Sequence, residues 1–184
     1  EMQDDALARS GNAVREDMKP GQVKYYVGTM GLPGQERVIT AAREEWFPEA
    51  KNPPVASVAD ALVAKYGAPT ERQQTNSGQV YLRWAHDPSG QPITAASNPN
   101  RCYGVDSPDG GANVSPDCGI VVQARVTPMP ENPSLAKFIQ VGVVDQANGF
   151  AALNAVEAGL KAQDEARKAK ELNDATKNAA APKL

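Results

Sequence analysis

Cys102 and Cys118 are the residues whose type and spacing suggest chemistry most directly, and they are the only cysteines of the chain. The segment between them is rich in Gly and Pro and carries Asp106, Asp109 and Asp117. Two cysteines that bracket a turn-rich segment favour a disulfide, and closing a loop of about 15 residues contributes roughly 3 kcal/mol on a chain-entropy account. Disulfides persist in oxidising compartments. We therefore predict a Cys102–Cys118 disulfide and a periplasmic or extracellular location.

Metal binding is the competing chemistry for the same segment. A structural zinc site needs about four ligands, and the chain has two cysteines and one histidine, His86, which lies outside the segment. Asp106, Asp109 and Asp117 offer oxygen ligands for calcium, although the spacing DSPDGG differs from that of the helix–loop–helix calcium pattern. Turn formation explains the same residues, because Pro fixes φ and Gly accepts positive φ. Calcium at these aspartates stays open as an alternative, and no cofactor is expected.

His86, Asp145 and the pair Glu44 and Glu45 are the remaining candidates for acid–base chemistry. As a general base, His86 would need a reacting group nearby and an orienting carboxylate, but its position before the turn signal DPSG indicates a turn-flanking residue. Asp145 follows a predicted strand and is expected to accept hydrogen bonds from the QANG turn. Glu44 and Glu45 are expected on a helix, in solvent. We expect a non-catalytic protein; the alternative is a small hydrolase or ligand-binding protein with an unrecognised pocket.

The composition of the chain excludes further classes. Its 184 residues are 41% hydrophobic and 22% charged, which is usual for a globular protein. The net charge is −3, and the absence of a block of like charges argues against nucleic acid as the partner. No apolar run approaches the roughly 18 residues that span a bilayer. The chain begins with Glu and lacks a secretion-signal pattern, so we expect a mature or trimmed form, from which a signal peptide could have been removed.

Hydrophobic periodicity predicts the elements that must position these residues. Alternating apolar residues predict strands, and apolar residues at helical spacing predict helices. The predicted strands cover 22–30, 79–86, 119–127 and 136–145, with a weak short strand over 91–97. The predicted helices cover 32–47 and 57–69, the second beginning at a Ser57 cap and ending at Gly67. We predict an α+β fold in which a helical hairpin packs on a roughly four-stranded antiparallel sheet, followed by a long C-terminal helix.

The chain divides into three predicted parts. Residues 1–20 are expected to form a flexible or loosely helical arm, 21–160 a single α+β domain, and 161–184 an extended C-terminal helix and tail. The C-terminal helix carries an apolar stripe that should dock on the domain, formed by Phe150, Leu153, Val156 and Leu160. Beyond this stripe Leu172 is the only large apolar residue before the terminal Leu184, so the helix is expected to continue past the body of the domain.

One stretch, VADALVAKYGAPTERQQTNSGQVYLRWAHD, shows a helix that ends in YGAP, a polar segment, and a strand that carries Trp84. This pattern resembles the SmpA/OmlA-like envelope domains and the β-lactamase-inhibitor-protein-like (BLIP-like) fold, in which a helix ending in LG-x-P precedes a strand containing Trp. The resemblance implies a non-catalytic envelope protein that binds other proteins. It carries over no site residue.

Tyr81 and Arg83 are the predicted recognition residues. They alternate with Val80, Leu82 and Trp84, so they should lie on the outer face of the sheet. Tyr and Arg are favoured at binding hot spots, and the projecting C-terminal helix is the second candidate surface. The expected function is a protein-binding module of the periplasm or the extracellular space whose partner is a protein of the cell envelope.

Overall fold

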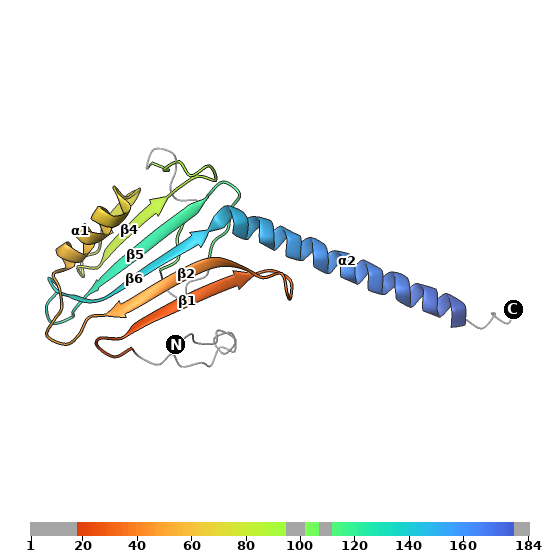
Figure 1. Ribbon diagram of the computed structural model, residues 1–184, viewed down its shortest axis with the longest axis horizontal. Helices are drawn as coiled ribbons and strands as arrows, with labels where there is room; N and C mark the ends of the chain where they lie inside the picture. The colour runs from red at the N-terminus through yellow and green to blue at the C-terminus, as the bar shows by residue number, and fades with distance from the viewer. Residues whose placement is uncertain (1–17, 95–101, 107–111, 179–184) are drawn as a thin grey trace.

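The computed structural model describes residues 18–94, 102–106 and 112–178, which are built around a six-stranded antiparallel sheet. In chain order the elements are β1 (Val23–Met30), β2 (Arg37–Trp46), α1 (Val55–Tyr66), β3 (Glu71–Gln74), β4 (Val80–Ala85), β5 (Ile120–Pro128), β6 (Ala136–Asp145) and α2 (Gln146–Asn178). The strand order is β1-β2-β6-β5-β4-β3, and α2 leaves the end of β6 (Figure 1). The α+β class and the long C-terminal helix are confirmed.

The predicted helical hairpin is wrong, because residues 37–46 of the expected first helix form strand β2. The segment AAREE consists of good helix formers, but β2 lies between β1 and β6 and makes a ladder with each. This pairing overrides the local preference. The sheet accordingly has six strands where roughly four were predicted. The expected strand over 91–97 is reduced to a bridge between His86 and Pro92, and its residues 95–97 lie outside the described residues.

Helix α1 matches the prediction closely at its C-terminal end. Gly67 adopts a φ of 82°, and its N–H donates to the carbonyl oxygen of Val63 at 2.9 Å. At the other end Pro54 occupies the N-cap, and the expected cap Ser57 lies inside the first turn. Proline suits a helix start because its missing N–H would have no partner there.

The two faces of the sheet carry different cores. We call the face covered by α1 the α1 face and the other the opposite face. Trp84 anchors the α1 face, since its Nε1 donates to the carbonyl oxygen of Gly67 at 2.8 Å. The core of the α1 face is formed by Val55, Ala59, Leu62, Val80, Leu82, Trp84, Ala124, Val126, Ala136 and Ile139. The core of the opposite face is formed by Ile39, Ala85, Cys102, Val105, Cys118, Val121 and Val144.

The predicted disulfide is confirmed. Cys102 and Cys118 are bonded with an S–S distance of 2.06 Å and a Cα–Cα distance of 5.6 Å, and both are buried in the core of the opposite face. The described residues of the segment between them run over β5 and β6. Gly142 permits this close approach, because a Cβ at that position would lie 1.8 Å from the carbonyl oxygen of Val105.

Helix α2 contacts the sheet only near its start and then extends away from it (Figure 1). The apolar stripe docks in part: Phe150 and Val156 are half-buried, while Leu153 and Leu160 stay exposed. Every residue of 161–178 except Asp164 is exposed. Ion pairs between residues three and four positions apart stabilise this exposed part of the helix. The contacts of Asp164 with Lys168 and Arg167 lower the pKa of its carboxyl group. In the described parts of the chain, neither helix is long and apolar enough to cross a membrane.

Candidate functional site

Helix α1 packs over β4, β5 and the Ile139 end of β6, and it leaves β1, β2 and the rest of β6 uncovered on the α1 face. The antiparallel register aligns apolar side chains across these three strands. Val27 is paired with Ala41, which in turn is paired with Val143. In the neighbouring row Tyr25, Arg43 and Val141 are aligned in the same way. The two rows form an apolar floor whose only charged member is Arg43.

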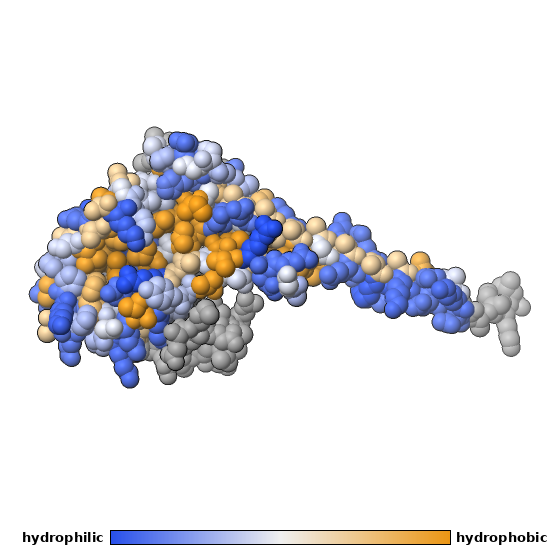
Figure 2. All heavy atoms as spheres, viewed as in Figure 1, coloured by the Kyte–Doolittle hydropathy of each residue, from blue (hydrophilic) through white to orange (hydrophobic). Residues whose placement is uncertain are grey.

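A groove of about 800 Å³ runs between this floor and α1. Its α1 wall includes Val58, Ala61, Lys65 and Tyr66. Figure 2 shows hydrophobic residues gathered on the exposed surface beside α1. Ala41 in the floor and Ala61 in the wall line the groove, and their small side chains leave space between the sheet and α1.

The charges around the groove are few and mostly paired. Among the described residues that line it, the charged ones are Arg43, Glu45 and Lys65. Arg43 Nη2 lies 2.5 Å from Glu45 Oε2, and Lys65 Nζ lies 4.9 Å from the centre of the Tyr66 ring. This arrangement is suited to burying apolar side chains.

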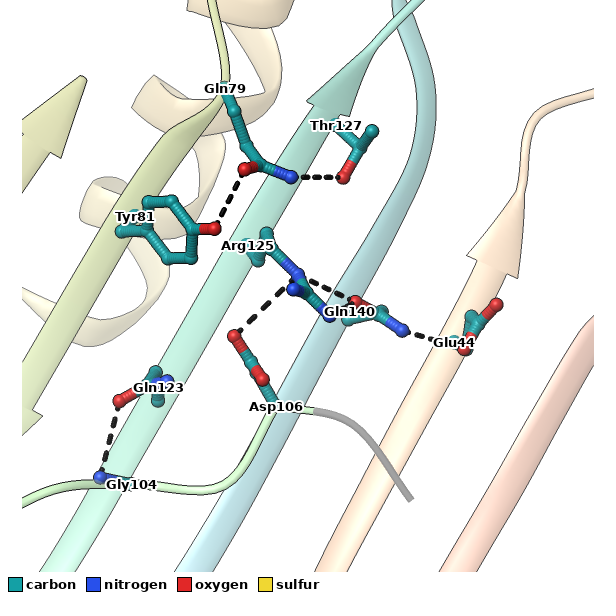
Figure 3. A network of polar contacts seen from close by, with 9 residues as sticks. All are labelled: Glu44, Gln79, Tyr81, Gly104, Asp106, Gln123, Arg125, Thr127 and Gln140. Carbon is teal, nitrogen blue, oxygen red and sulfur yellow. Dashed lines mark hydrogen bonds and ion pairs between the residues drawn. The ribbon is translucent and has the colours of Figure 1, made fainter. Parts of the chain in front are cut away.

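The opposite face carries a chain of polar contacts across three strands (Figure 3). Gln140 Nε2 donates to Glu44 Oε2 at 2.7 Å, and Gln140 Oε1 accepts from Arg125 Nε at 2.8 Å. Arg125 also lies 3.7 Å from Asp106 Oδ2. Trp46 Nε1 donates to Glu44 at 2.8 Å. The network links β2, β6 and β5 to the segment that follows Cys102.

The expectation that Glu44 and Glu45 lie on a helix in solvent is therefore wrong. Both lie on β2, where alternate residues face opposite sides of the sheet. Glu44 is only 4% exposed, on the opposite face, and Glu45 is half-buried beside Arg43 on the α1 face. A buried carboxylate is tolerated when donors satisfy it, as Gln140 and Trp46 do here.

Tyr81 and Arg83 point to the opposite face, but this face is not open at Arg83. Arg83 is 6% exposed, forms an ion pair with Glu71, and its Cζ lies 4.6 Å from the centre of the Tyr103 ring. Tyr81 is half-buried, and its hydroxyl donates to Gln79 Oε1 at 2.7 Å. The role of the two residues in protein binding stays a prediction. Alternation along β4 gave their direction, but it could not show that Tyr103 would cover Arg83.

A small cavity of about 160 Å³ lies beside Arg83, Tyr81 and Tyr103. Arg83 Nε is buried there without a hydrogen-bond partner among the described residues. The neighbouring Glu71 carboxylate, already bonded to Arg83 Nη2, lines the same cavity. Its negative charge opposes the binding of an anion at this position.

The candidate calcium ligands are not brought together by the described residues. Asp106 faces Arg125, and Asp117 is exposed, with its backbone N–H bonded to Ser115 Oγ at 3.2 Å. Asp109 lies outside the described residues. In the described ranges there is no group of three or more His, Cys, Asp or Glu side chains placed to hold a metal ion.

His86 and Asp87 do not form a catalytic pair. The Asp87 carboxylate accepts hydrogen bonds from Ser89 Oγ at 2.7 Å and from the backbone N–H of Gln91 at 2.9 Å, which lowers the pKa of Asp87. His86 Nδ1 lies 3.1 Å from the carbonyl oxygen of Ile120. Asp87 therefore shapes its own turn. Asp145 accepts a hydrogen bond from Asn148 Nδ2 at 2.6 Å. The expected QANG turn is the first turn of α2, which begins at Gln146.

Sequence reasoning missed the groove for one reason. With residues 32–47 assigned to a helix, Val23, Tyr25 and Val27 had no neighbouring strand to complete an apolar floor. Their alternation was the available signal. Its meaning depends on the pairing of β1 with β2 and of β2 with β6, which joins residues far apart in the chain.

Comparisons of the chain with protein families, with curated proteins and with solved structures find no match. The local pattern on which the envelope-domain resemblance is based is present, as α1, the polar strand β3 and the Trp84-bearing strand β4. Strand β2 stands where a helix was expected before α1. The function therefore has to be inferred from the geometry of this chain.

Proposed function

We propose that the protein is a non-catalytic binding module that takes up an amphipathic helix of a protein partner in the groove beside α1. The observation that carries this proposal is the width of the uncovered sheet. Adjacent strands lie about 4.8 Å apart, so β6, β2 and β1 together span about 10–14 Å, and a helix with its side chains is about 10 Å across. The uncovered part of the α1 face has room for one helix beside α1.

The chemistry of the floor also favours a helix with one apolar face. Tyr25 is 60% exposed and Val27 is 45% exposed, and both adjoin the apolar floor on β2 and β6. Contiguous apolar surface of this kind marks interaction sites in soluble proteins. An amphipathic helix reaches such a floor with side chains at positions i, i+3, i+4 and i+7. Each large apolar side chain that becomes fully buried contributes about 1.5–3 kcal/mol.

The charges at the rim favour a partner helix with acidic residues beside its apolar stripe. Glu45 is already paired with Arg43, whereas the ammonium group of Lys65 stands at the α1 wall over the Tyr66 ring. An acidic side chain of the partner could pair with Lys65 at the polar rim. Such rim pairs set orientation and association rate more than affinity.

The disulfide supports a periplasmic or extracellular location for the protein. Cys102 and Cys118 are bonded to each other and buried, and such bonds persist where the surroundings are oxidising. The partner we propose is accordingly a protein of the cell envelope or the extracellular space. The local resemblance to envelope domains points to the same compartment.

A small apolar ligand is the second candidate occupant. The volume of about 800 Å³ lies within the roughly 300–1,000 Å³ that is usual for ligand pockets. The candidate ranks second because such pockets place several polar groups to orient the ligand. Among the described lining residues, Arg43 and Glu45 already form an ion pair with each other.

Selection of helical peptides from a displayed library against the purified protein tests the proposal. The Ala61→Glu variant places a charge in the groove wall, and Ala162→Glu makes the same change on an exposed turn of α2. Selected peptides should bind the Ala162→Glu variant as they bind the parent protein. Binding to Ala61→Glu should weaken at least about tenfold, the equivalent of about 1.4 kcal/mol.

Two results would contradict the helix proposal. One is equal binding of the selected peptides to both variants, which would place their site elsewhere. The other is a failure to select any helix while a fatty acid or another small apolar compound raises the unfolding temperature of the parent protein and not that of Ala61→Glu. The second result would assign the groove to a small ligand.

A further inference from the structure

The sheet ends in two edge strands of opposite character. Strand β3 has four residues, Glu71–Gln74, all polar and exposed, and short polar edges resist pairing with other chains. Strand β1 has eight residues. The side chains of Val23, Tyr25 and Val27 on β1 are 38%, 60% and 45% exposed. Among the described residues, no strand pairs with the outer side of β1.

The backbone groups of β1 that face away from β2 belong to the same three residues. The N–H of Trp46 donates to the carbonyl oxygen of Gln22 at 2.9 Å. Because the backbone groups of an antiparallel strand point alternately to its two sides, the even-numbered residues of β1 bond toward β2. The N–H and C=O groups of Val23, Tyr25 and Val27 therefore point away from β2, along the open edge.

The sequence of β1 is compatible with antiparallel pairing to itself. A two-fold axis places one residue opposite its own copy, and the β-bulge between Gly28 and Thr29 confines regular pairing to the part before it. With Tyr25 at the axis, Val23 lies opposite the partner's Val27. Aromatic and β-branched pairs of this kind stabilise neighbouring strands.

The position of Lys24 distinguishes between registers. With Tyr25 at the axis, Lys24 lies opposite the partner's Tyr26, where an ammonium group next to an aromatic ring is favourable. A register shifted so that Lys24 lies at the axis puts two like charges directly opposite each other, which is destabilising. The charge pattern of β1 thus favours the Tyr25-centred register.

We propose that β1 pairs with β1 of a second copy of this chain, antiparallel and centred on Tyr25, to form a symmetric dimer with one continuous sheet. The α1 faces of both copies lie on the same side of that sheet, so the two apolar floors meet at Tyr25. The pairing involves one short strand from each copy, and interfaces below about 1,200 Å² are weak. We therefore expect a dimer whose population rises with concentration.

Sedimentation velocity of the full chain tests the dimer. Over protein concentrations from about 5 µM to about 500 µM, a range suited to weak interfaces, the mean mass should rise from one chain toward two. The Tyr25→Lys variant places like charges at the axis and should stay monomeric. The control Val38→Lys changes another exposed strand residue, which lies on β2 away from the edge, and it should dimerise as the parent does.

Crosslinking tests the register without relying on a disruptive substitution. A Tyr25→Cys variant, treated with a short bis-maleimide, should crosslink to itself. Lys24→Cys should crosslink far more with Tyr26→Cys than with itself. A parent protein that stays monomeric over the whole range would overturn the proposal, as would equal dimerisation of Tyr25→Lys and Val38→Lys. The Ala61→Glu variant should dimerise normally, so a failure of helix binding and a failure of dimerisation can be told apart.

Discussion

The carboxylate of Glu44 on β2 accepts a hydrogen bond of 2.7 Å from Gln140 on β6, although the two residues are 96 positions apart in the chain. It also accepts one of 2.8 Å from the indole N–H of Trp46. The buried carboxylate thereby joins the β1–β2 hairpin to the rest of the sheet, and this hairpin supplies two of the three strands of the groove floor.

Replacing Glu44 with Leu should lower the free energy of unfolding by about 1–3 kcal/mol, because it leaves the amide of Gln140 and the indole N–H of Trp46 without their acceptor. Urea unfolding followed by Trp fluorescence measures the change. Glu45→Leu is the control. Its partner Arg43 is exposed, so that substitution should change stability by less than about 1 kcal/mol. Equal losses in both variants would show that the Glu44 contacts add nothing of their own.

Removing the disulfide by Cys102→Ser and Cys118→Ser should destabilise the protein by about 2–4 kcal/mol, since the crosslink restricts the unfolded chain. Thiol titration of the unfolded, non-reduced protein checks the bond itself and should find essentially no free thiol. Two titratable thiols would contradict the bond and remove the support for an oxidising compartment.

Truncation after Lys170 should leave the unfolding midpoint nearly unchanged, because residues 171–178 are exposed and bury little apolar area. Truncation after Asn154 is the comparison. It removes Val156 and the Gly159 turn that contacts Leu32, so it should lower the midpoint by several degrees. A large loss already at Lys170 would mean that the exposed part of α2 packs against another surface.

Gly142→Ala should destabilise the protein by about 1–3 kcal/mol, because the new Cβ would lie 1.8 Å from the backbone oxygen of Val105 and force the covering segment off the sheet. Gly159→Ala is the matched control. The Cβ added at Gly159 would lie 2.7 Å from a terminal methyl group of Leu32, which can move aside. Alanine also has a higher helix propensity than glycine. Chemical denaturation of the two variants gives the comparison, and a neutral Gly142→Ala would show that this segment does not lie tightly on β6.

The parts of the fold that local signals determine could be predicted from the sequence. The end of α1 could be predicted from Gly67, because glycine readily adopts the positive φ found there. Strands β4, β5 and β6 could be predicted from their alternating apolar residues. β2 could not be recognised, because AAREE favours a helix and pairing with β6 decides otherwise. β3 has no alternating pattern, since ERQQ lies at an edge and is exposed throughout.

The candidate site was harder to predict than the fold. The exposure of Arg83 depends on Tyr103, which reaches it from the segment after Cys102. The groove depends on which strands α1 leaves uncovered, and this is a property of the whole sheet. A sequence of alternating Val and Tyr residues on β1 is equally consistent with a buried strand and with an exposed floor.

Photocrosslinking in the cells that make the protein tests the central claim most directly. A benzophenone amino acid at Ala61 stands in the groove wall, and the same group at Val38 stands on an exposed strand position that does not line the groove. The groove proposal predicts a discrete adduct of a second protein from Ala61, mapped to an amphipathic helix of that protein and absent from Val38. Adducts of equal yield at both positions, or adducts from Ala61 that contain only lipid or other small molecules, would contradict it.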